Sequence, residues 1–178
     1  MIRIKISRFL GLTASAALIL LITGCGYSFT PTGEHIATRI KTVFVDTFSN
    51  RTSEAYVENY LRQAFIDEFI KGRRFKLVGK PEMADAILKG SIKSLTISHL
   101  SYDINNIAVE ERVTMTMEII FEEQDTHEII WSNKDISGME DYQITTDQLT
   151  TENSRKNAII KLSNDTAEKA YRLMMSDF

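Results

Sequence analysis

The chain is poor in several residue types, and each shortage narrows the possible class of protein. It has one cysteine, two prolines, eight glycines and three histidines among 178 residues. A single cysteine excludes an intramolecular disulfide and a zinc site built from cysteines. The few glycines and prolines exclude a collagen-like or low-complexity chain. Acidic side chains outnumber basic ones, with a formal charge of −3, so there is no sign of a nucleic-acid binder. The length and the 43% apolar share fit one globular domain, or at most two small ones.

The first 24 residues have the features of a secretory signal peptide. Arg3, Lys5 and Arg8 come first with no acidic residue among them, and residues 9–23 form an uncharged, mostly apolar run. A membrane-spanning helix needs about 20 apolar residues, so this run is short for a span. A basic segment, a short apolar segment and small residues are typical of a signal peptide, which we predict over residues 1–24.

The lone cysteine stands directly after this segment, in the sequence Leu21-Ile22-Thr23-Gly24-Cys25. An aliphatic residue, two small residues and a cysteine form the lipobox of bacterial lipoproteins. We therefore predict that the Cys25 thiol receives diacylglycerol, that the chain is cut before it, and that the new amine is acylated. The alternative is a buried free cysteine that follows a signal peptide by chance. Lipidation leaves no thiol to mispair in an oxidising compartment, and several acyl chains anchor a protein firmly.

The predicted cleavage changes the charge of the mature chain. It removes three basic side chains and no acidic one, which leaves 18 basic and 24 acidic side chains and a formal charge of about −6. An acidic body is not attracted to anionic lipid heads, so the anchor has to hold the protein at the membrane. An aspartate directly after the lipidated cysteine favours retention in the inner membrane. This chain has Gly26 at that position, which permits sorting to the outer membrane. We expect residues 25–37 to form a short lipidated tether, with one short strand at 27–29.

Hydrophobic periodicity predicts one α+β domain over residues 38–178. The expected strands span 40–48, 75–78, 84–102, 113–121 and 128–137, with a hairpin tip at 103–106. Thr52 or Ser53 should cap a helix that runs to about Lys71, where Gly72 should end it in the left-handed conformation. A second helix is expected from about 150 to 174. The apolar parity changes between Ile92 and Leu95, which predicts a bulge or a bend near Ser94.

The order of these elements predicts a two-layer sandwich. One mostly antiparallel sheet of four to five strands would pack on the two helices, since a single covered face is the economical way to bury both layers. Met115 and Met117 lie on the apolar face of the clearest strand, so we interpret them as core residues rather than interface residues.

The chain shows no pattern typical of catalysis or metal binding. His35, His99 and His127 match no metal-ligand spacing, and no nucleophile or phosphate-loop motif is present. The acid pairs Glu110-Glu111 and Glu122-Glu123 occupy neighbouring strand positions, whose side chains point to opposite faces. We interpret them as solvated hairpin charges. The prediction is a protein that is not an enzyme, with no catalytic residue, no metal and no cofactor beyond the lipid on Cys25.

A basic cluster follows the first predicted helix. Lys71, Arg73 and Arg74 lie together in an otherwise acidic body and could bind phosphates or acidic sugars. The alternative is the ordinary cationic C-terminus of a helix, where positive side chains interact favourably with the helix dipole.

Three segments together carry a resemblance to a known family. They are Cys25-Gly26-Tyr27-x-Phe29, Val45-x-x-Phe48-x-Asn50-Arg51-Thr52 and Ala84-Asp85-Ala86-x-Leu88-x-Gly90. With the lipobox and the element order, the mature chain resembles the lipopolysaccharide-assembly lipoproteins of the LptE family. The third segment also occurs in other periplasmic lipoproteins that combine a sheet with helices, so the combination carries more weight than any one part.

The resemblance implies a fold of about four strands on two helices, and a role without covalent chemistry. Members of the family sit on the periplasmic side of the outer membrane, inside the LptD β-barrel, as a plug and assembly partner. They contact lipopolysaccharide on its way to the outer leaflet. The family's lipid-contacting residues have no motif that maps here, so the candidates come from charge alone: Lys71, Arg73, Arg74, Lys89 and Lys93. The alternative is a non-enzymatic subunit of another envelope or secretion complex.

Overall fold

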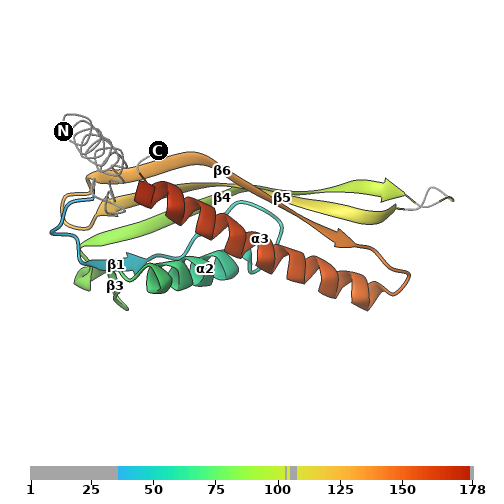
Figure 1. The fold of residues 1–178 in the computed structure, drawn as a ribbon, viewed down its shortest axis with the longest axis horizontal. Coiled ribbons are helices and arrows are strands. Elements are labelled where there is room, and N and C mark those ends of the chain that lie inside the picture. Colours follow the sequence, from blue (N-terminus) through green and yellow to red (C-terminus); the bar gives the residue numbers. More distant parts are fainter. Residues whose placement is uncertain (1–35, 103, 105–107, 177–178) are drawn as a thin grey trace, which may run out of the picture. The chain divides into compact units, whose positions relative to one another are not determined.

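The computed structural model describes residues 36–102, 104 and 108–176 (Figure 1). These residues belong to one compact unit, Thr32–Phe178. The predicted signal peptide, Cys25, most of the tether and the strand predicted at 27–29 lie outside the described residues. The same holds for the predicted hairpin tip at 103–106, except for Ile104.

The sheet has six strands and mixed pairing. Its members are β1 (Thr42–Val45), β2 (Ser49–Asn50), β3 (Lys76–Leu77), β4 (Ala86–Tyr102), β5 (Ala108–Glu123) and β6 (Ile129–Gln143). The order is β3-β1-β4-β5-β6, with β2 also beside β4. The three long strands pair antiparallel, whereas the short β1, β2 and β3 pair parallel. The predicted α+β class is confirmed, with one strand more than expected.

The additional strand arises because the segment predicted as one strand at 40–48 is divided in two. After β1, Asp46 still donates its backbone N–H to the carbonyl of Leu88, at 3.0 Å. The chain then turns so that Phe48 enters the core and stacks on Phe65, with ring centroids 5.3 Å apart. β2 continues along β4 with the register Ser49 opposite Ser91. Burial of the Phe48 ring therefore interrupts the strand that the β-branched pattern predicted.

The predicted bulge in β4 is confirmed. The ladder between β4 and β5 shifts between Ile92 and Ser94. The shift places Ile92 opposite Met117 and Leu95 opposite Met115, so apolar residues on both sides of the bulge face the same side of the sheet. Met115 and Met117 are fully buried there, which confirms their interpretation as core residues.

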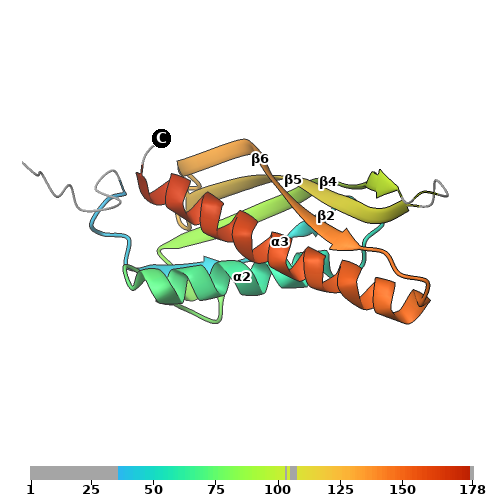
Figure 2. The ribbon, with the colours of Figure 1, turned by 45° about the vertical axis from the view of Figure 1, so that its right-hand side comes forward.

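Two helices cover that face of the sheet (Figures 1 and 2). They are α2 (Val57–Gly72) and α3 (Gln148–Ser176), and a single 3-10 turn, η1 (Pro81–Met83), precedes β4. The expected second helix is confirmed, with two more residues at each end. At the centre of the core, the Phe69 ring meets Tyr171 edge-on at 5.2 Å and lies 6.4 Å from Phe121. Aromatic contacts thus join α2, α3 and β5.

The predicted end of α2 at about Lys71 is confirmed to within one residue, but both predicted caps are wrong. The helix begins at Val57 after Tyr56, which has φ of 68°, and no side chain caps it. Thr52 cannot serve as the cap, because its hydroxyl accepts a hydrogen bond from the backbone N–H of Glu54 within a tight turn. At the other end, Arg73 adopts the left-handed conformation with φ of 54°, and Gly72 is the last helical residue.

Gly72 is instead required by the contact between the helices. A Cβ atom at this position would overlap the hydroxyl of Tyr171 on α3. The glycine therefore lets the tyrosine ring approach the backbone of α2.

Candidate functional site

The cluster of Lys71, Arg73 and Arg74 lies where α2 ends. The Lys71 ammonium donates to Glu68 Oε1 at 2.6 Å, and this hydrogen bond raises the pKa of Lys71. The Arg74 guanidinium lies over the Phe75 ring, 5.1 Å from its centroid, and donates to the backbone carbonyl of Ile36 at 2.7 Å. Arg73 is exposed, as its left-handed backbone turns the chain away from the helix. The cluster therefore lies at the end of α2 with Arg73 exposed and with Lys71 and Arg74 engaged by neighbouring groups.

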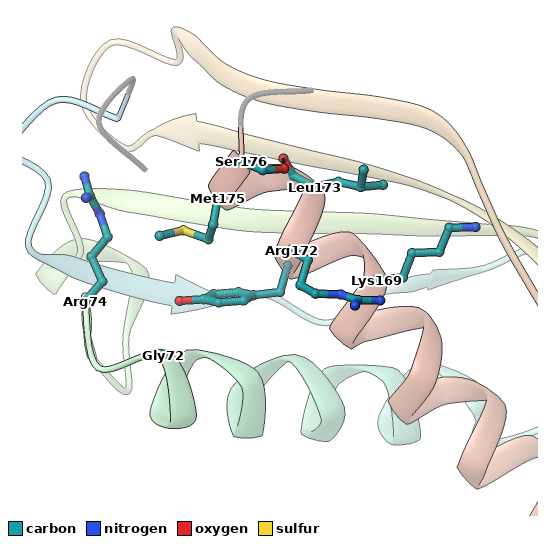
Figure 3. Close-up of a pocket in the computed structure, with 8 residues that line it drawn as sticks. Gly72, Arg74, Lys169, Arg172, Leu173, Met175 and Ser176 are labelled. Atoms are coloured by element: carbon teal, nitrogen blue, oxygen red, sulfur yellow. Dashed lines mark hydrogen bonds between the residues drawn. The ribbon is translucent and has the colours of Figure 1, made fainter. Parts of the chain in front are cut away.

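A cavity of about 790 Å³ adjoins this cluster, between the C-terminal ends of α2 and α3 (Figure 3). From α2 and the turn after it come Gly72 and Arg74. The lining residues from α3 are Lys169, Tyr171, Arg172, Leu173, Met175 and Ser176. We name this space the helix-end cavity. Its wall combines aliphatic side chains and an aromatic ring with three cationic side chains.

The two α3 cations of the helix-end cavity have weak partners. The Lys169 ammonium donates to the backbone carbonyl of Ser137 at 2.9 Å, which leaves its charge uncompensated. The Arg172 guanidinium lies 3.8 Å from Glu168 Oε1, and both side chains are more than half exposed. Exposed pairs of this kind contribute little stability. The cavity thus presents positive charge to solvent.

Sequence reasoning missed Lys169, Tyr171 and Arg172. The two cations are spaced three residues apart and so lie on one face of a helix, which the periodicity could have shown. Only the packing of the two helix ends places that face beside Arg74.

Lys89 and Lys93 are not part of this site. Lys89 neighbours the buried Leu88 in β4 and therefore points to the face of the sheet that the helices leave open. Its ammonium donates to Glu122 Oε1 at 2.6 Å. Lys93, at the bulge, donates to the carbonyl of Lys134 at 2.6 Å and to Asp135 at 3.1 Å. The five candidate cations therefore form two separate groups.

The interpretation of the acid pairs as solvated charges is wrong. Glu122 is buried, and although burial opposes its ionisation, hydrogen bonds from Lys89 and His127 hold its pKa below the usual range. The Glu111 carboxylate accepts a hydrogen bond from the hydroxyl of Tyr142 and lies 2.9 Å from His99 Nδ1. These acids are structural members of polar networks. Within the described ranges, no group of three or more potential ligands could hold a metal ion.

A second surface feature lies at the far end of the β4–β5 hairpin. Apolar side chains are more than a third exposed there. They are Ile97, Leu100, Tyr102, Ile104 and Val109. Isolated exposed apolar residues are ordinary, but several on one hairpin end are typical of a contact surface.

No helix among the described residues is long and apolar enough to cross a bilayer. Comparison with protein families finds a match over most of the chain. The LptE family model, described as lipopolysaccharide-assembly, matches residues 40–174, from the residues before β1 to the last turns of α3. No curated protein matches the chain.

Solved structures with a similar fold include several lipoproteins. An uncharacterised lipoprotein B from Nitrosomonas europaea is 14% identical, with 84% of this chain and 90% of that chain covered and a TM-score of 0.52. Rare lipoprotein B from Shewanella oneidensis is 17% identical, with 72% and 93% covered and a TM-score of 0.50. The PelC dodecamer from Paraburkholderia phytofirmans is 9% identical, with 82% and 94% covered and a TM-score of 0.51. At these identities the likeness concerns the fold.

Proposed function

Since the chain belongs to the LptE family of lipopolysaccharide-assembly proteins, we propose that it is an outer-membrane lipoprotein that plugs an LptD-like β-barrel. In that position it helps the barrel assemble and assists delivery of lipopolysaccharide to the outer leaflet, without covalent chemistry of its own. The observation that carries the proposal is the family match, which covers the whole sheet, α2 and all but the last two residues of α3.

The open face of the sheet supports a position inside a barrel. Alternate residues of β5 point to this face and are polar: Arg112, Thr114, Thr116 and Glu118. Arg112 makes a two-point hydrogen-bonded pair with Asp141 of β6, at 2.7 and 2.8 Å. The lumen of an outer-membrane barrel is polar, so a plug needs a surface of this composition. The exposed apolar end of the β4–β5 hairpin supplies a second contact surface for the same partner.

Anchoring through Cys25 is part of the proposal. Diacylglycerol on the thiol and an acyl chain on the amine would hold the periplasmic domain at the outer membrane, despite the acidic charge of the mature chain.

A tagged full-length chain, purified from outer membranes in mild detergent, tests the partner. We expect a large β-barrel protein to co-purify at a fixed ratio. Recovery of inner-membrane or secretion machinery alone would contradict the proposal and favour a subunit of another envelope complex. Ile104 is the fully exposed residue of the hairpin end, and Ile104→Asp or Ile104→Lys should reduce co-purification of the barrel. The matched change at Met83, exposed on η1, should not.

For contact with lipopolysaccharide, we propose the cluster of Lys71, Arg73 and Arg74, with Lys89 and Lys93 as a second, separate group. Replacing the first three residues by Ser should weaken binding of purified lipopolysaccharide by about tenfold, because cations bind phosphates through charge-assisted hydrogen bonds. Binding is measured with immobilised lipopolysaccharide and the purified full chain, and circular dichroism checks the fold. The matched change of Lys89 and Lys93 separates the two groups. Unchanged binding by the triple variant would remove the cluster from the proposal.

A further inference from the structure

We propose that a second copy of this chain pairs with β4 along residues 94–99, so that two sheets continue through one antiparallel contact between their β4 strands. We name residues 94–99 the free β4 edge. The inference goes beyond the function proposed above and does not rest on it, since it concerns chains that are not seated in a barrel.

The free β4 edge has a neighbouring strand on one side only. On the side away from β5, β1 pairs with residues 86–88 of β4, and β2 pairs with residues 91–92. Figure 2 shows β4 continuing past β2. Within the described ranges, no strand other than β5 pairs with residues 94–99. Alternate residues of this stretch therefore direct their backbone N–H and C=O groups away from β5, where no strand receives them.

The sequence of the free β4 edge carries none of the usual protection against strand pairing. Residues 94–99 read Ser-Leu-Thr-Ile-Ser-His, without lysine, arginine, an acidic residue, proline or glycine. The register shifts of the ladder lie before Ser94 and after His99, so the stretch between them is regular. Ile97 is more than a third exposed, and Thr96 and Ser98 are exposed beside it. A regular, uncharged and exposed edge is a ready template for another strand.

The other two outer edges of the sheet are protected. β3 is only two residues long, and short edge strands offer little to pair with. On β6, the carbonyl of Ser137 already accepts a hydrogen bond from the Lys169 ammonium of α3, at 2.9 Å. The same strand carries four charged side chains: Lys134, Asp135, Glu140 and Asp141. The contrast within one sheet indicates that the free β4 edge is open to a partner strand.

Charge and side-chain pattern select a second copy as that partner. The chain is acidic overall, with a formal charge of −3, but two free β4 edges meet without any carboxylate or ammonium between them. A two-fold axis at Ile97 would place this residue opposite its own counterpart, on the face where it lies beside Val113. On the other face, Thr96 would lie opposite the counterpart of Ser98. Apolar side chains thus meet apolar ones and hydroxyls meet hydroxyls, as stable cross-strand pairs and a self-complementary two-fold contact require.

Disulfide trapping tests the pair in the full-length chain. Two differently tagged copies with Ile97→Cys are produced together in excess, and their membranes are treated with a mild oxidant. Opposite residues of antiparallel strands are about 4.5–5.5 Å apart between Cα atoms, within the reach of a disulfide. We expect a linked species that carries both tags. Cys25 is the single native cysteine, so the unchanged chain measures the background.

Met139→Cys is the matched control for the position of the cysteine. Met139 is also apolar and exposed, but it lies on β6, at the protected edge. We expect no linked species above background from this variant.

An added lysine then connects the linked species to strand pairing. Ser98→Lys, in the chain with Ile97→Cys, should reduce the linked species by about fivefold, because a lysine on an edge strand opposes pairing. Ser137→Lys, the same change at an exposed serine of β6, should leave the linked species unchanged. Circular dichroism checks that both variants keep the fold.

Each other result would overturn the inference. Such results are no linked species, equal linkage from positions 97 and 139, tags that stay separate, a linked protein other than this chain, or linkage insensitive to Ser98→Lys. Co-purification of the barrel is measured separately, on chains without the added cysteine. Absence of the linked species with the barrel still co-purifying rejects only the pair, and a linked species without the barrel rejects only the barrel partner.

Discussion

At the scale of single residues, Asp85 and Gly90 explain why the segment Ala84-Asp85-Ala86-x-Leu88-x-Gly90 is informative. One carboxylate oxygen of Asp85 accepts hydrogen bonds from the backbone N–H groups of Lys41 and Thr42, both at 2.8 Å. The Asp85 N–H donates back to the carbonyl of Thr42 at 3.0 Å. Asp85 therefore fixes the start of β1 against β4. Gly90, five positions after Asp85, leaves room for the ring of Phe48.

Asp85→Asn should weaken the acid dependence of stability. Backbone hydrogen bonds from Lys41 and Thr42 hold the pKa of Asp85 below its usual range in the folded protein. The unfolded carboxyl binds a proton first as the pH falls, so this contribution is complete above about pH 4 and is lost as the pH falls through the lower folded pKa. Urea unfolding from pH 6 to pH 3 should show a smaller decline in the variant. Asp125→Asn, in an exposed turn, is the control and should retain the decline.

Gly90→Ala should lower the free energy of unfolding by about 2 kcal/mol, because extra volume in a packed core forces neighbours out of place. A Cβ atom at this position would overlap the ring of Phe48, which is buried and stacked on Phe65. Gly79→Ala is the matched control, since nothing lies within 4 Å of its Cβ position. Urea unfolding of both variants gives the comparison, and equal stability would contradict the packing argument.

At the scale of elements, the sequence predicted what local periodicity determines. Alternation identified β5 and the bulge of β4, and the helical stripe identified α3 to within two residues at each end. β6 runs six residues further than expected, to Gln143. Its second half is polar, and the carboxylates of Glu140 and Asp141 in it pair with Lys161 and Arg112 from other elements. Partners distant in the sequence stabilise this strand, and a periodicity window cannot detect them.

The start of α3 depends on a cap that the helical pattern does not include. Asp147 accepts hydrogen bonds from the backbone N–H of Thr150, at 2.9 Å, and from its hydroxyl, and these hold the pKa of Asp147 below its usual range. Asp147→Ala should therefore let the first turn of α3 fray, since the side chain satisfies a free N–H group there. Hydrogen–deuterium exchange should accelerate at residues 149–151 and stay unchanged beyond Ala158. Asp165→Ala, in the middle of α3, should not accelerate exchange at the first turn.

At the scale of the whole molecule, the candidate site was only half predictable. The cluster of Lys71, Arg73 and Arg74 is contiguous in sequence, so composition alone revealed it. The helix-end cavity needs Lys169, Tyr171 and Arg172, about 100 residues further on. They meet the cluster because α2 and α3 pack on one face of the sheet with their C-terminal ends together (Figure 3). Local patterns do not specify which helix ends meet.

Cys25→Ala should release the protein from membranes. Without lipid on this residue, residues 25–178 carry a formal charge of about −6, which does not attract them to anionic lipid heads. Fractionation of cells that express the full-length chain measures the change, with Gly26→Ala as a control that leaves the cysteine in place. Complete retention of the variant in membranes would show that the uncut N-terminal segment provides the attachment.

The position of β1 has a mechanical consequence for a protein held by its N-terminus. β1 lies between β3 and β4 and is parallel to both. A pull on the anchor proposed at Cys25 would reach the described domain at Ile36 and then β1, six residues later. Strands loaded along their length share the force among all their hydrogen bonds, whereas a hairpin opened at its end breaks them one at a time. With the proposed anchor, a pull along β1 would load it in shear against both parallel neighbours, the arrangement that resists extension best.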